Sequence, residues 1–134
     1  MKLTRASSYA LHAVAYMAQQ KVQDKPVASH HIAAARNIPE RFLLKVLKPL
    51  VSARVLTSIK GPNGGYRLAK TADKISMLEI LEAVDGPIRG MAPFSEESNG
   101  PLNHKLETIC KDAATATRKQ LEKVTIADLA AGKK

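Results

Sequence analysis

The sequence predicts a mainly α-helical protein with one small β-hairpin, and three observations lead to this class. Apolar residues recur at helical spacing over most of the chain. Two short runs that alternate apolar and polar residues, 55–60 and 66–69, flank a glycine-rich stretch. The chain of 134 residues can bury one core without disulfides. We therefore expect one helical domain, a hairpin and a modest helical appendage.

The first helix is expected over residues 4–21, and residues 24–26 (Asp-Lys-Pro) should follow it as a break. Its basic start and apolar middle would also suit a signal peptide. Polar residues interrupt the apolar part, which favours an amphipathic helix instead. One of them, His12, is expected to be partly packed. The apolar stripe of this helix consists of Ala10, Leu11, Val14, Met17 and Ala18.

The next segment has the pattern of a helix-turn-helix, which is two short helices joined by a tight turn. Ser29 is a candidate N-cap for a helix over 30–36, and residues 36–38 form the turn. Pro39 is expected at the first position of the second helix, where its missing N–H costs nothing. Pro49 should kink or loosen the last turn of that helix. Its apolar face is expected at Phe42, Leu43, Val46, Leu47, Leu50 and Val51.

The opposite face of the second helix is mostly cationic. In a helix-turn-helix this helix enters the major groove of DNA, and its N-terminal residues reach the base edges. We expect Arg41 and Lys45 to contact base edges, while Glu40 can accept a hydrogen bond from cytosine. The whole face consists of Glu40, Arg41, Leu44, Lys45, Lys48 and Ser52.

A hairpin directly after a helix-turn-helix is a wing, and residues 55–69 have this place. Gly61–Gly65 form its turn, in which Gly64 and Gly65 permit positive φ. A glycine-rich tip can approach a phosphate backbone or enter a minor groove, with Lys60 and Arg67 supplying charge. The stretch is not a nucleotide phosphate loop, because the G-x-x-x-x-G-K-[ST] pattern is absent and no helix follows.

Positive charge is concentrated in one half of the chain. Residues 1–70 hold 12 Lys or Arg and 2 Asp or Glu, a net charge of +10, whereas residues 71–134 hold 9 and 10, a net charge of −1. A one-sided positive charge favours a polyanion-binding module joined to a neutral part. Nucleic acid is the favoured partner, ahead of an anionic membrane surface or an acidic protein.

The second half predicts two capped helices and one long helix. Ser76 and Glu79 form a capping box before a helix over 77–85, and Thr125 and Asp128 form a similar start for 126–131. Between them, a loop over 86–103, expected to be mobile, precedes a helix from about 103 to 123.

The apolar stripe of this long helix has no large partner in so short a chain. A second copy is the economical partner, so we expect a dimerisation helix. The resulting division is a DNA-binding domain over 1–86, a variable loop over 87–103, and the dimerisation helix with a last short helix over 104–134. The expected dimer interface consists of Leu106, Ile109, Cys110, Ala113, Thr117 and Leu121.

Three stretches carry a resemblance to a known family: "RFLLKVLKPL" at 41–50, "KGPNGGYRL" at 60–68 and "ISMLEILEAVDGPI" at 75–88. With the order of elements, they make the chain resemble the Rrf-two family. These bacterial winged helix-turn-helix transcription regulators include the iron–sulfur cluster regulator, the nitric-oxide-sensing repressor and the cysteine-metabolism repressor. The resemblance covers almost the whole chain.

The resemblance implies a homodimer whose long C-terminal helices cross, bound to a pseudo-palindromic promoter site as a sequence-specific regulator, with repression expected. The recognition helix would enter the major groove and the wing the adjacent minor groove. The residues that would face DNA are Ser29, Pro39, Glu40, Arg41, Leu44, Lys45, Lys48, Lys60, Gly61, Asn63, Gly64 and Arg67.

Two positions depart from the family pattern. Members that bind a cluster carry three cysteines in the loop before the long helix, whereas the single cysteine here, Cys110, lies within the helix. We therefore predict no cofactor and no metal site, with atypical iron–sulfur ligation by Cys110, His104 and carboxylates as the disfavoured alternative. Arg54 stands where many members have glycine, and it would be slightly strained if that position needs positive φ.

Other readings of single residues stay open at this point. Cys110 is expected to be a packed thiol, with redox pairing across a dimer axis or metal ligation as alternatives. His30 and His31 could contact phosphate or be solvated. A partner metabolic enzyme could dock on Met91 and Phe94, which would make the chain a protein-interaction regulator.

The sequence excludes some classes of protein. No Ser-His-Asp, Cys-His or H-E-x-x-H arrangement is present, so we predict no enzyme. No apolar run is long enough to span a membrane, and a single cysteine fits a reducing cytoplasm. We therefore expect a cytoplasmic protein with no membrane partner.

Overall fold

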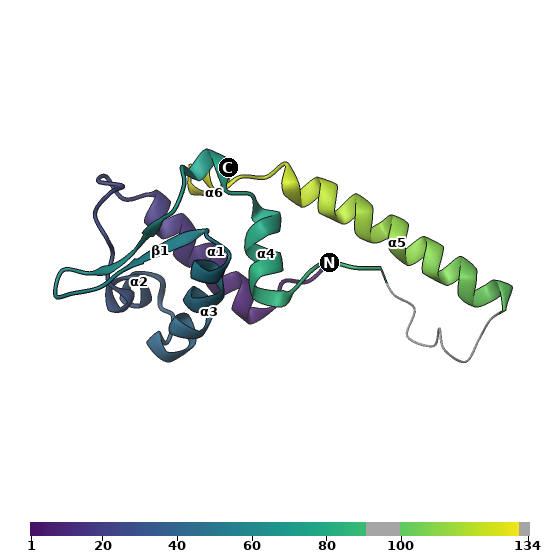
Figure 1. Cartoon of the computed structure of the whole chain (residues 1–134), viewed down its shortest axis with the longest axis horizontal. Helices are drawn as coiled ribbons and strands as arrows, with labels where there is room; N and C mark the ends of the chain where they lie inside the picture. The colour runs from purple at the N-terminus through teal and green to yellow at the C-terminus, as the bar shows by residue number, and fades with distance from the viewer. Residues whose placement is uncertain (91–99, 132–134) are drawn as a thin grey trace.

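The structure, a computed structural model, describes residues 1–90 and 100–131, which form a helical body with one long helix projecting from it (Figure 1). The predicted class, mainly helical with one antiparallel hairpin and a long C-terminal helix, is confirmed. In chain order the elements are α1 (Arg5–Ala18), α2 (Ser29–Arg36), α3 (Glu40–Ser52), β1 (Leu56–Ile59), β2 (Gly65–Leu68), the 3-10 helix η1 (Ala72–Lys74), α4 (Met77–Asp85), α5 (Pro101–Glu122) and α6 (Ile126–Ala130).

Helix α1 lies inside the body and packs against α2, α3, α4 and α6. Thr4 fixes its start, because the hydroxyl oxygen accepts a hydrogen bond from the N–H of Ser7 at 3.0 Å. The helix ends at Ala18, earlier than the predicted residue 21. His12 was expected to be partly packed but is exposed, because the helix turns a different face to the core. That face consists of Ala10, Leu11, Ala13, Val14 and Met17.

Helices α2 and α3 form the predicted helix-turn-helix, with two differences at their starts. The N-cap of α2 is Ala28, so Ser29 is the first helical residue rather than the cap. Pro39 is the N-cap of α3 rather than its first helical residue, so the helix begins one residue later than predicted. Asn37 ends α2 in the left-handed conformation at φ 53°, which asparagine tolerates and which turns the chain toward α3. The turn is closed by Ile38, which is buried.

Helix α3 continues past Pro49 to Ser52. Proline removes one helical hydrogen bond, yet Leu47 and Leu50 on either side are fully buried, and their packing holds the last turn helical. The chain then leaves the helix at Arg54, whose φ is 63°. The condition for strain at Arg54 is therefore met, since an arginine occupies a conformation that favours glycine.

The hairpin pairs Leu56 with Leu68 and Ile59 with Gly65 in antiparallel register. Positive φ occurs at Gly61 (106°) and Gly65 (150°), so Gly65 adopts the conformation that glycine permits at both positions, whereas Gly64 does not. Gly64 is needed for a different reason: a Cβ there would lie 2.1 Å from the carbonyl oxygen of Ile59. The tip is therefore built from glycine both for conformation and for close approach.

The two capping boxes that the sequence predicts are both present, at Ser76 with Glu79 and at Thr125 with Asp128. The two capped helices start side by side, because the N–H of Met77 donates to the carbonyl of Val124 at 2.8 Å. Helix α6 also packs on α1. The chain after α5 therefore returns to the body.

Candidate DNA-binding surface

One hydrogen bond joins the two helices of the helix-turn-helix at their starts. The hydroxyl of Ser29, the first residue of α2, donates to Oε2 of Glu40, the first residue of α3, at 2.7 Å. The predicted DNA-facing residues Ser29 and Glu40 are thus brought together by the structure. Glu40 already accepts one hydrogen bond within the protein, which orients its carboxylate before any base is present.

The exposed face of α3 is cationic, as the sequence predicts. Leu43, Leu47 and Leu50 are fully buried, and this fixes which face points outward. Leu44 on the outward face is 44% exposed. The exposed residues of α3 and its cap that were expected to face DNA are Pro39, Glu40, Arg41, Leu44, Lys45 and Lys48.

Phe42 is a residue that the sequence analysis misplaced. It was expected on the buried face, but its side chain is 41% exposed. Arg41 and Lys45 lie over its ring, with 5.2 and 5.6 Å from each cation to the ring centroid. Such contacts orient long flexible cations. A signal was present in the sequence, because Phe42 directly follows Arg41 and stands three residues before Lys45, at the edge of the apolar stripe.

The wing places its predicted residues in two environments. Lys60, Gly61 and Asn63 are exposed at the tip, whereas Gly64 and Arg67 are half-buried. The Arg67 guanidinium donates to the backbone carbonyl of Asp24 at 3.4 Å, so it leans on the connection between α1 and α2. Lys60 is therefore the more available cation of the two.

Two hollows flank the wing. One, of about 350 Å³, is lined by Lys60, Gly61 and Gly64 of the wing and by Ala28 and Ser29 at the start of α2. Since Ser29 is bonded to α3, this hollow joins the wing to the recognition helix. The smaller hollow therefore lies between the wing and a residue that is hydrogen-bonded to α3.

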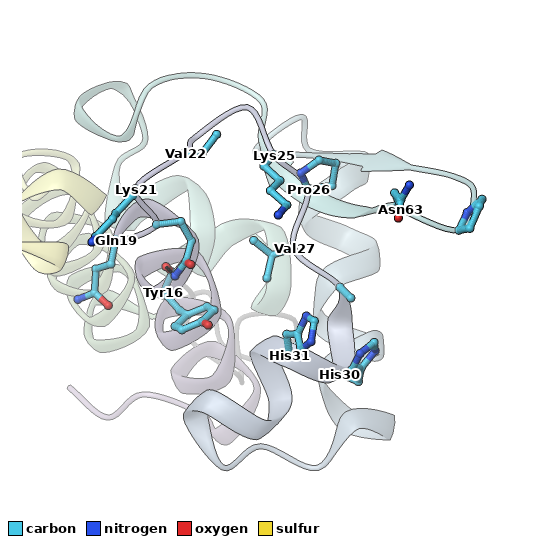
Figure 2. A pocket seen from close by; sticks show the side chains of 14 residues that line it. Tyr16, Gln19, Lys21, Val22, Lys25, Pro26, Val27, His30, His31 and Asn63 are labelled. Atoms are coloured by element: carbon cyan, nitrogen blue, oxygen red, sulfur yellow. Dashed lines mark hydrogen bonds between the residues drawn. The ribbon is translucent and has the colours of Figure 1, made fainter.

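The other hollow, of about 1070 Å³, opens between the wing tip and the connection from α1 to α2 (Figure 2). Lys21, Lys25, His30 and His31 line it, and no acidic residue does. The two histidines lie next to each other on α2, with ring centroids 4.4 Å apart, and both are exposed (Figure 2). The basic surface thus continues past the wing.

Acidic neighbours do not neutralise this surface. Among residues 1–90 and 100–131, the ion pairs within 4.0 Å are Lys70 with Glu79 and Arg118 with Glu82. The DNA-facing cations of α3 and the wing therefore have no carboxylate partner in the described part of the chain. Uncompensated positive charge on one exposed face is what a polyanion-binding surface requires.

The long helix α5 exposes three of the six residues expected at a dimer interface. Leu106 is 45% and Ile109 is 63% exposed, whereas Leu121 is 7% exposed and belongs to the chain's own core. Leu102, which the sequence analysis did not select, is 70% exposed and lies four residues before Leu106 on the same face. Of the remaining expected residues, Ala113 is exposed and Cys110 and Thr117 are half-buried.

The donor groups among residues 1–90 and 100–131 do not form a metal site. The chain has one cysteine, and the described residues hold no group of three or more His, Cys, Asp or Glu side chains that could bind a metal ion. An iron–sulfur cluster normally needs four protein ligands, and the described residues of one copy do not supply such a set around Cys110. No helix in the described ranges is long and apolar enough to cross a membrane. Met91 and Phe94, the expected docking residues, lie outside the described residues.

Comparison with known proteins assigns the chain to a family. The Rrf2 (Rrf-two) family, described as "Iron-dependent Transcriptional regulator", matches residues 3–132. The HTH-type transcriptional regulator NsrR of Halalkalibacterium halodurans is 30% identical over 96% of this chain and 90% of that relative. The HTH-type transcriptional regulator CymR of Bacillus subtilis is 29% identical over 97% of this chain and 90% of that relative.

A solved structure agrees with the sequence comparison. CymR (YrzC), the global cysteine regulator of B. subtilis, superposes with a TM-score of 0.80 at 26% identity, over 100% of this chain and 99% of that chain. The predicted winged-helix fold is thereby confirmed, and these relatives are regulators rather than enzymes. The chain belongs to the Rrf2 family, and it is a DNA-binding transcription regulator with a winged helix-turn-helix fold.

Proposed function

We propose that this chain acts as a homodimer that binds a pseudo-palindromic promoter site and represses transcription. The observation that carries the proposal is the exposed cationic face of α3, which continues through the start of α2 into the wing and lacks carboxylate partners in the described part of the chain. A dimer seated on a promoter blocks the polymerase, which is the basis of the repressor role. The protein would act in the cytoplasm, where the promoter is.

Each part of the surface has its own role in this proposal. Arg41 and Lys45, oriented over the ring of Phe42, contact base edges in the major groove. Glu40, whose Oε2 accepts a hydrogen bond from Ser29, selects cytosine because its carboxylate can still accept a second hydrogen bond from the base. The exposed wing tip at Lys60 enters the adjacent minor groove or contacts its phosphates, and together with the other cations gives strong salt dependence.

Helix α5 supports the homodimer. Its apolar stripe, with Leu102, Leu106 and Ile109 as the most exposed members, finds no cover within the described chain. A stripe of this kind is more often an interface than a solvated surface. Two copies that pack these stripes together would bring two recognition helices to one operator. The division into a DNA-binding domain over 1–86 and a dimerisation segment over 104–134 follows from these separate roles.

The cofactor state is part of the proposal. We propose that DNA binding needs no iron–sulfur cluster, since the chain brings a single cysteine per copy to any such site. Atypical ligation, or control by a partner enzyme that docks on residues 86–103, remains the alternative. No contact among the described residues favours either alternative.

The test is a binding titration with the purified protein. Fluorescence anisotropy measures affinity for the DNA upstream of the chain's own gene and for a random duplex of equal length, across a salt series. An absorption spectrum is recorded on the same sample. Tight, selective, salt-sensitive binding by a colourless dimer is the expected result. Equal binding to both duplexes would contradict cofactor-free recognition, and a visible absorption band would contradict the cofactor prediction.

A further inference from the structure

Helix α5 is anchored to the body near its C-terminal end. Of its 22 residues, only Leu121 is buried, and α5 packs chiefly on α4. The rest projects away from the body (Figure 1). At 1.5 Å per residue the helix is about 33 Å long, so a rotation of about 10° at its base would move the far end by roughly 6 Å. The contacts at the base of α5 therefore determine the position of any partner that binds along this helix.

One carboxylate at that base holds two segments at once. Oε2 of Glu82, on α4, accepts hydrogen bonds from the backbone N–H of Ile88 at 2.9 Å and from the guanidinium of Arg118 on α5. The Glu82 side chain is 21% exposed and that of Arg118 is 41% exposed. Charge-assisted bonds of this kind are stronger and more directional than neutral ones. Glu82 thus fixes both α5 and the chain that leaves α4.

Helix α4, which carries Glu82, is itself hydrogen-bonded to the N-terminal end of α1. At the end of α4, the carboxylate of Asp85 accepts hydrogen bonds from Thr4 at 2.9 Å and from the buried Ser7 at 2.5 Å, which ties α4 to α1. Beyond Ile88 the chain meets α5 again, since a Cβ on Gly90 would lie 2.2 Å from the backbone of Cys110. The carboxylate that contacts both segments is therefore carried by a helix that is itself hydrogen-bonded to α1.

We propose that Glu82 is a positioning residue that sets the angle between α5 and the DNA-binding body. In a dimer joined through α5, this angle determines the distance between the two recognition helices and hence the preferred spacing of the operator half-sites. The consequence for spacing rests on the proposed function, whereas the angle within one chain does not.

The angle is tested by electron spin resonance, which measures the distance between one spin label on the body and one on α5. Spin labels are attached at Asp73→Cys on η1 and Lys105→Cys on α5, in a Cys110→Ser background. An excess of unlabelled protein ensures that only pairs within one chain are measured. The measured distances therefore lie within one chain, and no DNA is needed.

Three substitutions are compared in this background. Glu82→Gln and Arg118→Gln should each broaden or shift a narrow distance distribution. Glu122→Gln, which removes the same charge from an exposed position of α5, should leave it unchanged. If Glu82→Gln does not fold, as judged by circular dichroism, the more exposed Arg118→Gln still decides. Unchanged distributions would overturn the proposal.

The second measurement uses duplexes with two half-sites whose spacer varies in single base-pair steps. The parent protein should prefer one spacing, and Glu82→Gln should reduce that preference several-fold while its affinity for a single half-site stays constant. An equal loss at every spacing, or no loss, would show that Glu82 does not set the spacing. If no variant binds DNA, the proposed function fails and the spin-label distances alone decide.

Discussion

Helices α3 and α5 each expose one face, and the two faces have opposite chemistry. On α3 the apolar stripe is buried and the outward face is cationic, with Arg41, Lys45 and Lys48 exposed. On α5 the apolar stripe itself is outward, with Leu106 and Ile109 exposed. A face of unpaired cations suits a polyanion, whereas an apolar face suits another apolar face. The same chain thus has separate surfaces for DNA and for a second copy.

The largest effect is expected from a charge on the apolar face of α5. In Ile109→Asp each copy loses about 1.5–3 kcal/mol of apolar burial and places a carboxylate in the interface. The dimer dissociation constant should rise by at least about 100-fold, as measured by sedimentation equilibrium. Affinity for the full operator should fall with it, while the stability of the single chain changes little.

Thr115→Asp is the matched control, because it adds the same charge at an exposed position on another side of α5. It should leave the dimer intact. Equal effects of the two substitutions would show that the apolar stripe is not the interface.

The next largest effect is expected on the cationic face of α3. Arg41→Ala should cost about 1–3 kcal/mol of binding free energy and relax the preference at one base pair. The measurement is anisotropy with a set of single-base operator variants. Lys74→Ala on η1, which removes an exposed cation far along the chain from α3, should have little effect. Unchanged affinity and base preference in Arg41→Ala would contradict the base-edge assignment.

A smaller effect is expected at the wing. Lys60→Ala should weaken binding to all sequences alike and lower the slope of log affinity against log salt by about 0.9, the contribution of one phosphate contact. Arg67→Ala should change the slope less, because its guanidinium already contacts the carbonyl of Asp24. A loss of base preference in Lys60→Ala would place this residue among the base-reading groups instead.

Sequence reasoning succeeded where local chemistry decides the structure. The capping boxes at Ser76 and Thr125 and the bounds of α4 follow from short-range hydrogen bonds, and they were predicted correctly. It failed where a neighbouring element decides. Phe42 is exposed because the packing of the leucines decides which face of α3 is buried. Ser29 donates a hydrogen bond to Glu40 of α3 instead of capping its own helix.

The site divides in the same way. The exposed cations of α3 follow from helical periodicity, so they could be predicted from the sequence. The Glu82 contact could not be predicted, because Ile88 and Arg118 lie far apart in the chain and meet only through the packing of α4 and α5. Likewise, Leu121 shares the periodicity of the exposed stripe but is buried where α5 joins the body.

The smallest effect is expected where α3 ends. Arg54 has φ 63°, a conformation that costs a residue with a Cβ about 1–2 kcal/mol, whereas glycine adopts it freely but loses more entropy on folding. Arg54→Gly should therefore raise the free energy of unfolding by about 0.5–1 kcal/mol, measured by urea denaturation. Arg54→Ala removes the same charge without relieving the backbone and should not stabilise the protein. If both variants stabilise it equally, repulsion among the positive charges of residues 1–70, rather than backbone strain, is the cause.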